Sequence, residues 1–375
     1  MGRCLCIRKD GKQCVRDAST KLGDNGQFCW QHQNCQVLKK EPIPKKSQKA
    51  ASQLPELQLP ELKLSQFQSP EKTGLKHLSS NKGNLVMPPI GFGTFIGIEH
   101  GHLEKEERLE VTKQAVLVAL KVGYRLLDLA INYHNHSSIK NALLETKVPR
   151  SQIFFIGKGD EGQTSIVQTI MEIFGCSEAE VGKGNCYLDL FLWHLPNPLH
   201  KHNYAVWDQM NYCKKMGYVK NIGVSNVYQN GLQALLDYCH DQHLDPPVAN
   251  EIELSLRNQE PVFHTFCEKN GIQLIGYSPL GYANVLMNLT DETVLQIAAT
   301  HNASAAQVIL AYLISQRITP IPSSRDAKKI LDNFGSVALS KQLLPTDIEK
   351  LAGLNWDFLS TTTSEHFKAL DESMI

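Results

Sequence analysis

The sequence carries no excess charge of either sign, because Lys and Arg together number 38 and Asp and Glu together also number 38. Without a net charge, no long-range field draws the whole protein onto nucleic acid or an anionic membrane. The sequence also has no apolar run long enough to span a bilayer, and its first residues lack the apolar core of a secretion signal. We therefore expect a cytoplasmic protein with no membrane partner.

Cysteine, by contrast, is concentrated near the start of the chain, where five of the ten cysteines lie within residues 4–35. Disulfides are rare in the reducing cytosol, so we interpret the five scattered cysteines as buried free thiols and the cluster as a metal site. Since about 35 residues cannot build an adequate core, a structural zinc ion would supply the folding energy of this segment. The predicted ligands follow the spacing C-x9-C-x14-C-x2-H and are Cys4, Cys14, Cys29 and His32.

Two further cysteines, Cys6 and Cys35, leave the choice of ligands open, and an unstructured tail with reactive thiols is the alternative interpretation. Basic residues in the same segment would permit contact with nucleic acid or a protein, although a solvated face is the commoner explanation. The spacing resembles a small zinc-binding motif of the type C-x9-C…C-x2-H. We assign residues 1–35 to a zinc module.

Residues 36–84 are rich in Lys, Ser, Gln and Pro, and they contain the short duplication LPELQLPELKL at 54–64. The prolines would break any helix, and the composition offers too little apolar surface for a packed core. We predict a disordered linker here, with a binding role for the repeat as the alternative. The globular domain is expected over residues 85–375.

Within that domain, short apolar runs alternate with segments of helical periodicity. This order indicates an α/β fold with a parallel sheet covered by helices, and eight such units in about 250 residues match the size of a (β/α)8 TIM barrel. An open doubly wound sheet competes, but no GxGxxG follows the first strand, as a dinucleotide-binding Rossmann unit would require. The predicted strands are 90–95, 124–130, 153–158, 187–194, 219–225, 248–254, 272–278 and 319–323. The helices predicted between them include 105–121, 162–175, 204–216, 230–242, 260–269, 304–316 and 325–334.

Polar residues lie at or near the carboxyl ends of these strands, which is where barrel enzymes build their active sites. Asp128, Lys158 and His194 follow this rule, and Tyr133 comes five residues after Asp128. Taken singly, each residue has an ordinary structural explanation, such as helix capping or a hydrogen-bonded core histidine. Their joint occurrence on one rim predicts an active site.

Seven motifs lie along these strands and the residues that follow them. They are GFGTF at 91–95, YRLLDLAINY at 124–133, IFFIGK at 153–158, YLDLFLWHLP at 187–196, MGYVKNIGVSN at 216–226, LIGYSPLG at 274–281 and ITPIPSS at 318–324. In combination they resemble the aldo-keto reductase family, across residues 85–375. The resemblance implies reduction of an aldehyde or ketone with hydride from NADPH, and a catalytic tetrad of Asp128, Tyr133, Lys158 and His194.

Simple acid–base chemistry explains why these four residue types are needed. A free tyrosine has a pKa of about 10 and is a poor acid near neutrality. The Lys158 ammonium would lower the pKa of Tyr133, the general acid, and Asp128 would hold that lysine in place. His194 would donate a hydrogen bond to the substrate carbonyl and support the negative charge that develops on its oxygen.

By the same resemblance, Tyr277 would stack on the nicotinamide ring, while Ser225 and Asn226 would hold its carboxamide. Glu251 stands where the family has Gln. Its carboxylate can accept a hydrogen bond from the carboxamide, but it adds negative charge near a ring that becomes positive on oxidation, so we expect a shifted redox poise. The other cofactor-binding residues that the resemblance implies are Thr94, Asp128, Ser278, Leu280, Ser323, Ser324, Lys329 and Asn333.

The expected site for the 2′-phosphate of NADP departs from the family pattern at two positions. Ser323 stands in place of a lysine, and Lys329 stands in place of an arginine. Arginine binds phosphate with two hydrogen bonds whereas lysine is a point charge, so the site keeps one cation of two. NADPH remains the expected cofactor, with a modest preference over NADH.

For the substrate site, the resemblance implies Phe95 and Trp193 beside Tyr133 and His194. Two short loops at the rim imply an open pocket suited to a small carbonyl substrate, such as a small aldehyde, a ketoaldehyde or a sugar-like carbonyl. The tail at 355–375 is a candidate for another wall, and we expect a monomeric barrel. A catalytically weak nicotinamide-binding regulatory protein, or an adaptor that binds partners through the zinc module, is the alternative. The intact tetrad favours the enzyme.

Overall fold

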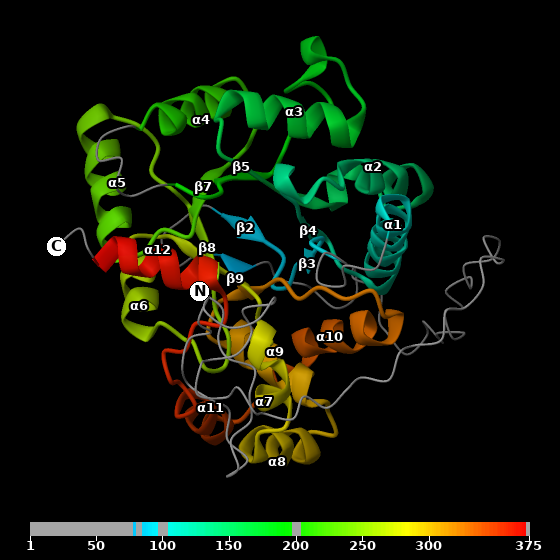
Figure 1. Ribbon diagram of the computed structural model, residues 1–375, viewed down its shortest axis with the longest axis vertical. Helices are drawn as coiled ribbons and strands as arrows, with labels where there is room; N and C mark the ends of the chain where they lie inside the picture. The colour runs from blue at the N-terminus through cyan, green and yellow to red at the C-terminus, as the bar shows by residue number, and fades with distance from the viewer. Residues whose placement is uncertain (1–77, 80–84, 97–103, 197–203, 373–375) are drawn as a thin grey trace, which may run out of the picture. The chain divides into compact units, whose positions relative to one another are not determined.

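The computed structural model describes residues 78–79, 85–96, 104–196 and 204–372 (Figure 1). All of them belong to Leu57–Ile375, one of the two units into which the chain divides. The predicted zinc ligands, and most of the predicted linker, therefore lie outside the described residues.

Eight parallel strands form one sheet, in the order β10-β9-β8-β7-β6-β5-β4-β3. Strands that are adjacent in this sheet are also consecutive in the sequence. Right-handed crossovers between adjacent parallel strands produce this order. The prediction of eight strands is confirmed, and no observed strand is longer than its predicted range. The strands are β3 (Phe92–Gly93), β4 (Leu126–Asp128), β5 (Phe154–Gly159), β6 (Leu190–Trp193), β7 (Ile222–Ser225), β8 (Ala249–Glu253), β9 (Gln273–Tyr277) and β10 (Thr319–Pro320).

The first and last segments of the sheet meet. Gly91 N donates to Pro320 O at 3.0 Å, and Gly93 N donates to Pro322 O at 3.1 Å. Glycine is needed at this seam, because a Cβ on Gly93 would lie 2.9 Å from the carbonyl oxygen of Ile321. A curled sheet of eight parallel strands whose two ends hydrogen-bond to each other fits a (β/α)8 barrel.

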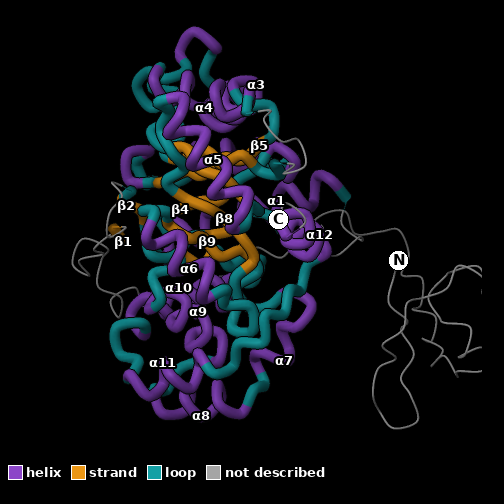
Figure 2. Tube along the Cα trace, turned by 90° about the vertical axis from the view of Figure 1, so that its left-hand side faces the viewer, coloured by secondary structure: helices purple, strands orange, loops and turns teal. Residues whose placement is uncertain are grey.

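A short hairpin precedes the barrel strands. Strand β1 (Leu78–Ser79) pairs antiparallel with β2 (Val86–Met87). Leu85 and Met87 are buried and pack with the apolar residues inside the curled sheet. Figure 2 shows the hairpin on the opposite side of the sheet from the last helix, α12 (Thr362–Glu372). Strand β1 lies within the segment that the sequence assigns to the linker.

Helices cover the outer face of the sheet (Figures 1 and 2). The seven predicted helices are present with shifts of a few residues at their ends, and several further helical elements were not predicted. The predicted ones are α1 (Lys105–Val122), α3 (Gln163–Phe174), α4 (Ala205–Lys215), α5 (Gln229–Gln242), α6 (Pro261–Lys269), α9 (Ala305–Ser315) and α10 (Ala327–Leu339). The others are α2 (His136–Glu145), α7 (Val285–Leu289), α8 (Glu292–Thr300), α11 (Pro345–Ala352), α12, and the 3-10 helices η3 (Ile131–Tyr133), η4 (Arg150–Gln152), η5 (Glu178–Glu180) and η6 (Tyr282–Asn284).

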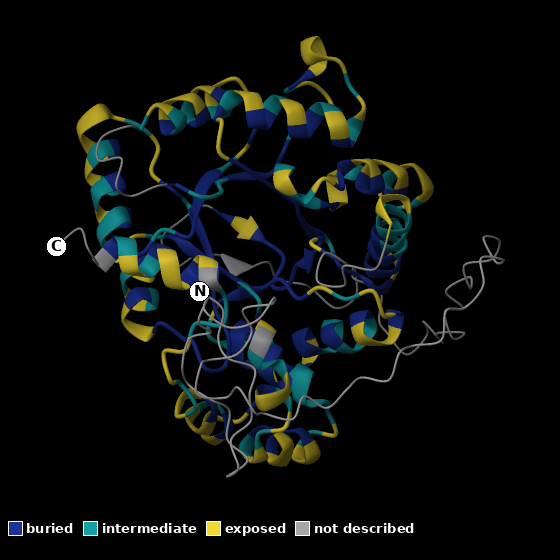
Figure 3. Ribbon diagram, viewed as in Figure 1, coloured by how far each residue is buried: buried dark blue, intermediate teal, exposed yellow. Residues whose placement is uncertain are grey.

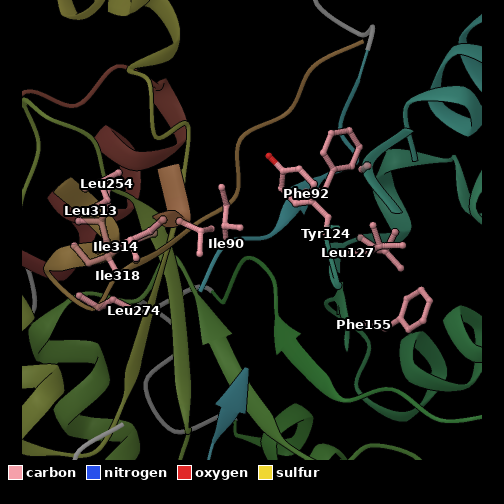
Figure 4. Packing of buried hydrophobic residues seen from close by; sticks show 14 of the residues in the cluster. Ile90, Phe92, Tyr124, Leu127, Phe155, Leu254, Leu274, Leu313, Ile314 and Ile318 are labelled. Carbon is pink, nitrogen blue, oxygen red and sulfur yellow. The ribbon is translucent and has the colours of Figure 1, made fainter. Parts of the chain in front are cut away.

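Apolar side chains fill two layers, one inside the curled sheet and one between the strands and the helices. Along β5 the two layers alternate, since Phe155 packs in the outer layer and Ile156 in the inner one. Figure 3 shows the buried strands surrounded by helices whose exposed residues face outward. Figure 4 shows part of the outer layer, where the rings of Phe92 and Tyr124 meet edge to face with centroids 5.7 Å apart. This packing holds the strand ends, and the polar residues on them, in fixed positions.

The C-terminal segment runs from α11 to α12 along the connection that follows β8. The backbone N–H groups of Trp356 and Phe358 donate to the carbonyl oxygen of Arg257, at 3.1 and 2.9 Å. The Arg257 guanidinium lies 4.0 Å from the centre of the Trp356 ring, a cation–π contact. The segment is therefore fixed to the carboxyl side of the sheet before α12 begins.

In the part of the chain that the structure describes, no single helix has the length and apolar character to cross a membrane. Helices α8 and α9 meet those criteria only as a pair, and the pair is bent by 89°.

Candidate active site

The four predicted catalytic residues come from three neighbouring strands and from the connection that follows the first of them. Asp128 is the last residue of β4, Lys158 lies near the end of β5, and His194 directly follows β6. Tyr133 ends the 3-10 helix η3, which follows β4. Because the carboxyl ends of parallel strands share one rim, the fold brings these side chains together.

Lys158 is the centre of the group. Its ammonium is fully buried and donates to both oxygens of Asp128, at 2.7 and 2.8 Å, and to Oε1 of Glu251 at 2.6 Å. Burial lowers the pKa of Lys158, but the two carboxylates outweigh burial and raise it well above its usual value. The lysine therefore keeps its charge, and one cation is shared between two acids.

The pKa values of Asp128 and Glu251 are both raised in this environment. Burial raises the pKa of Asp128 despite the neighbouring ammonium of Lys158. Burial and the Asp128 carboxylate together raise the pKa of Glu251 to about 8. Two carboxylates beside one ammonium would leave a buried net negative charge if both ionised, so Glu251 holds its proton at neutral pH.

Tyr133 lies beside this group. The Lys158 ammonium is 5.3 Å from the centre of the Tyr133 ring, and the Phe95 ring packs on the same tyrosine with centroids 4.9 Å apart. Burial raises the pKa of Tyr133, Lys158 lowers it, and the Asp128 and Glu251 carboxylates raise it again. The acidifying influence expected of Lys158 is present, but the net shift is upward because burial and two nearby acids outweigh it.

His194 completes the group, with its ring edge-on to that of Tyr133 and the two ring centres 6.2 Å apart. Burial, followed by the positive charge of Lys158, lowers the pKa of His194 to about 3. The imidazole is therefore neutral at pH 7 and carries a single N–H.

A second group of predicted residues gathers at the ends of β7 and β9. The Ser225 hydroxyl donates to the carbonyl oxygen of Glu251 at 2.8 Å. The Asn226 amide donates to the carbonyl oxygen of His194 and to the Ser225 hydroxyl, each at 3.1 Å. The Tyr277 hydroxyl donates to Oδ1 of Asn226 at 2.8 Å. The residues expected to hold the nicotinamide are thus joined to each other and to the catalytic group.

The family model for the Aldo/keto reductase family matches residues 89–355. The chain belongs to the aldo/keto reductase family. Among curated proteins, aldose reductase B of Dictyostelium discoideum is 31% identical over 310 residues, covering 75% of this chain and 93% of that protein. Glyoxal reductase of Bacillus subtilis (strain 168) is 32% identical over 289 residues, covering 76% and 95%.

Solved structures show the same fold. An aldo-keto reductase from a Medee basin deep-sea metagenome library has a TM-score of 0.62 at 28% identity, covering 74% of this chain and 95% of that one. A structure of aldo-keto reductase AKR2E5 complexed with NADPH has a TM-score of 0.65 at 23% identity, covering 76% and 90%. This chain is therefore an oxidoreductase of the aldo/keto reductase family, and the regulatory or adaptor alternative is not favoured.

The predicted phosphate side of this aldo/keto reductase lies around the start of α10. Ser323 and Lys329 are exposed, and Asn333 is buried on α10. The Asp326 carboxylate accepts from the backbone N–H groups of Lys328 and Lys329, at 2.8 and 3.3 Å. This cap places a negative charge where the helix N-terminus would otherwise attract phosphate.

Four further predicted residues, Thr94, Ser278, Leu280 and Trp193, occupy different surroundings. The buried Thr94 hydroxyl donates to the carbonyl oxygen of Asp128 at 2.7 Å. Leu280 and Ser278 follow β9, and Ser278 has a left-handed backbone with φ of 50°. Trp193 packs against the apolar layer between the sheet and the helices, whereas the Tyr133 ring lies between those of Phe95 and His194 as a neighbour of each.

Sequence reasoning missed two buried polar residues of the site. Asn135 donates to the carbonyl oxygen of Thr94 at 2.8 Å and so fixes the loop that carries Phe95. Glu253 ends β8, is fully buried, and contacts the C-terminal segment. The sequence signal for Glu253 was its spacing from Glu251 within the predicted strand 248–254, since residues two apart on a strand lie on the same face.

None of the described residues forms a group of three or more His, Cys, Asp or Glu that would hold a metal ion. The predicted ligands Cys4, Cys14, Cys29 and His32 lie outside that part of the chain. The five scattered cysteines are free thiols, as expected. Cys213, Cys239 and Cys267 are buried, whereas Cys176 and Cys186 are only partly buried.

Proposed function

We propose that the enzyme reduces small aldehydes, ketoaldehydes or sugar-like carbonyls, with Tyr133 as the proton donor. The observation that carries the proposal is the buried Lys158–Asp128 pair at 2.7 Å, beside Tyr133 and His194 on one rim of the sheet. Two similar proteins are named aldose reductase B and glyoxal reductase, and both names refer to small carbonyl compounds.

The nicotinamide supplies the hydride that goes to the carbonyl carbon, and the protein supplies the proton. The Tyr133 hydroxyl gives its proton to the carbonyl oxygen, so one C–H and one O–H bond form and the C=O double bond becomes single. The phenolate that remains lies near the Lys158 ammonium, which stabilises it. The neutral His194 imidazole donates its N–H to the same oxygen and supports the developing charge.

The residues at the rim fit a nicotinamide cofactor. Oε2 of Glu251 is buried and has no hydrogen-bond partner within the protein. Because Oε1 accepts from Lys158, the proton of the neutral acid is on Oε2, which can donate to the carbonyl oxygen of the nicotinamide carboxamide. Ser225 and Asn226 stand beside it, and Tyr277 offers a ring face. Ser323 and Lys329 would contact the 2′-phosphate. The pyrophosphate, ribose and adenine would be held by Ser278, Leu280, Ser324 and the buried Asn333.

Of the two cations that the family pattern places at the 2′-phosphate, only one position, Lys329, is still basic. With the nearby Asp326, this supports only a modest preference for NADPH over NADH. We further propose that Phe95 forms a wall of the substrate pocket, with Trp193 and the C-terminal tail nearby.

We also propose that residues 1–35 form a zinc module, that 36–84 form a linker and that 85–375 form a monomeric cytoplasmic barrel. The zinc would be held by Cys4, Cys14, Cys29 and His32. The charge pattern of the module permits nucleic-acid or protein contact, and the choice of ligands supports a structural role for the metal.

The decisive experiment follows NADPH absorbance with a panel of small aldehydes and ketoaldehydes. We expect turnover by the parent enzyme and a fall in kcat of at least about 100-fold for Tyr133→Phe, because the phenyl ring has no proton to give. Cofactor affinity, measured by tryptophan fluorescence quenching, should stay within a few fold. A Tyr133→Phe variant that turns over like the parent would rule out the proposed proton donor.

A further inference from the structure

The end of β8 holds a buried acid that the reaction chemistry does not use. Glu253 has no exposed surface and is paired in register with Tyr277 of β9. Its carboxylate accepts five hydrogen bonds, all from the segment 360–364. An isolated acid at a buried strand end would be costly, so these contacts fasten the C-terminal segment to the sheet.

The five donors come from three residues. Ser360 donates from its backbone N–H and its hydroxyl to Oε1, at 2.6 and 2.5 Å. Thr361 donates in the same two ways to Oε2, at 3.0 and 2.7 Å. The Ser364 hydroxyl, also buried, is 2.8 Å from Oε2. Both carboxylate oxygens are therefore satisfied from α12 and the residues just before it.

Ser364 differs from the other two residues, because it also reaches the cofactor side of the site. Its Oγ lies 2.6 Å from the Tyr277 hydroxyl, which in turn is 2.8 Å from Oδ1 of Asn226. Glu253, Ser364, Tyr277 and Asn226 are thus linked in a row by polar contacts, and the two hydroxyl protons of Ser364 and Tyr277 can fill two of the three links at a time.

The far end of α12 is fastened as well. The Asp371 carboxylate accepts from the backbone N–H groups of Asn230 and Gly231, at 3.0 and 2.7 Å, at the start of α5. Lys368 forms an ion pair with Glu260, the residue before α6. Figure 1 shows α12 lying beside α5 and α6. The helix therefore joins the connections that follow β7 and β8, and Ser364 joins it to the end of β9.

We propose that Ser364, held by Glu253, positions the Tyr277 ring, so that helix α12 sets the affinity of the site for the nicotinamide cofactor. This proposal rests on the proposed function, in which Tyr277 packs on the nicotinamide ring. Glu253 and Ser364 are positioning residues, because they act through Tyr277.

The number of hydroxyl protons among these linked side chains explains why Tyr277 needs Ser364 as a neighbour. The Tyr277 hydroxyl has one proton and two neighbouring acceptors, Asn226 Oδ1 and Ser364 Oγ. When the carboxamide N–H groups occupy Asn226, Tyr277 can donate to Ser364, which can donate to Glu253. The buried hydroxyl then stays satisfied in both arrangements, and the ring does not rotate away.

The test is the dissociation constant of NADPH, measured on the full chain by tryptophan fluorescence quenching without substrate. Ser364→Ala removes the contact with Tyr277 and should weaken binding by about 3- to 10-fold, the value of one hydrogen bond. Ser360→Ala is the matched control, because it also removes a hydroxyl from Glu253 but has no contact with Tyr277. Its dissociation constant should stay within about twofold of the parent, while both variants lose similar thermal stability.

A double-mutant cycle of Tyr277 and Ser364 is the second part of the test. Tyr277→Phe keeps the ring and removes the hydroxyl, so adding Ser364→Ala to it should weaken NADPH binding little further. Equal dissociation constants for the parent and Ser364→Ala, or equal weakening by Ser364→Ala and Ser360→Ala, would overturn the positioning role and leave the proposed function standing. A parent enzyme that does not bind NADPH would overturn both.

Discussion

Replacing Glu251 with glutamine should change how the stability of the enzyme depends on pH. The glutamine side chain has the same shape, and its carbonyl oxygen can accept the hydrogen bond that Lys158 now gives to Oε1 at 2.6 Å. What is lost is the ionisable proton. Glu251→Gln therefore isolates the effect of a second acid beside one buried ammonium.

The magnitude follows from the pKa of Glu251, which burial and Asp128 raise to about 8. In the unfolded chain a glutamate ionises near pH 4.3. Between these values the folded state holds one more proton than the unfolded state, so the free energy of unfolding falls as the pH rises and levels off above the folded pKa. Between pH 6.5 and 8 the parent should lose about 2 kcal/mol from this group alone, at 1.36 kcal/mol per pH unit.

In that pH range the effect of Glu251 on the free energy of unfolding can be told apart from the effect of His194. Burial and Lys158 hold the pKa of His194 down to about 3, so His194 changes the stability only below about pH 6.5, where the unfolded histidine takes up a proton. In the range from pH 6.5 to 8 the histidine contributes little, and the slope reports mainly on the acid.

The assay is urea unfolding of the parent and Glu251→Gln at several pH values from 6.5 to 8.5. The parent curve should fall with pH, and the variant curve should be flatter by about 2 kcal/mol over that range. Glu349→Gln, at an exposed position on α11, is the control for removing one acid from the surface. Parallel curves for the parent and Glu251→Gln would refute the inference that Glu251 is protonated at neutral pH.

Three other outcomes are expected. Ionisation of Glu251 should favour the oxidised cofactor, because it adds a negative charge beside the ring that becomes positive. The ratio of the NADP⁺ to NADPH dissociation constants should therefore fall a few fold from pH 7 to 9 in the parent and stay constant in Glu251→Gln. Fluorescence titration measures the two dissociation constants. Ser323→Lys should raise the preference for NADPH over NADH by about 10-fold or more, through one charged phosphate contact of about 1.5 to 3 kcal/mol, and an unchanged ratio would show that other residues set the preference. Metal analysis of the full chain should find about one zinc ion, lost in Cys29→Ser and kept in Cys213→Ser, and a parent purified without chelators that holds no zinc would contradict the module.

The strands and the rim were predictable because both depend on local pattern. Each apolar run of a barrel strand is buried on both faces, so a polar residue at its end is conspicuous, as Asp128 and Lys158 are. Helices α8, α11 and α12 were missed for the opposite reason. They bury only one narrow side, and the sequence of α12, TTSEHFKALDE, is largely polar.

Partners across the fold could not be predicted from local pattern. The sequence placed Glu251 toward the nicotinamide, but nothing local indicated that its carboxylate would bind Lys158, 93 positions away. The net rise in the Tyr133 pKa could not be predicted for the same reason. Lys158 lowers this pKa as expected, but the second acid and the depth of burial that outweigh it come from the packing of the curled sheet. Such contacts depend on which strands lie side by side, and their energies on the low-dielectric surroundings that packing creates.

Strand β8 carries both the acid that contacts Lys158 and the acid that contacts the C-terminal segment. Glu251 and Glu253 are two residues apart, so both lie on the face that points into the barrel, as their register partners Ile275 and Tyr277 also do. The deeper acid binds the lysine that serves the proton donor, and the acid at the rim binds the segment that holds Tyr277. Because the two acids have different partners, their effects should differ. Changes at Glu251 should alter how stability and cofactor binding depend on pH, whereas changes at Glu253 or Ser364 should alter cofactor affinity without changing that pH dependence. The same strand would then control proton transfer and cofactor binding through two independent contacts.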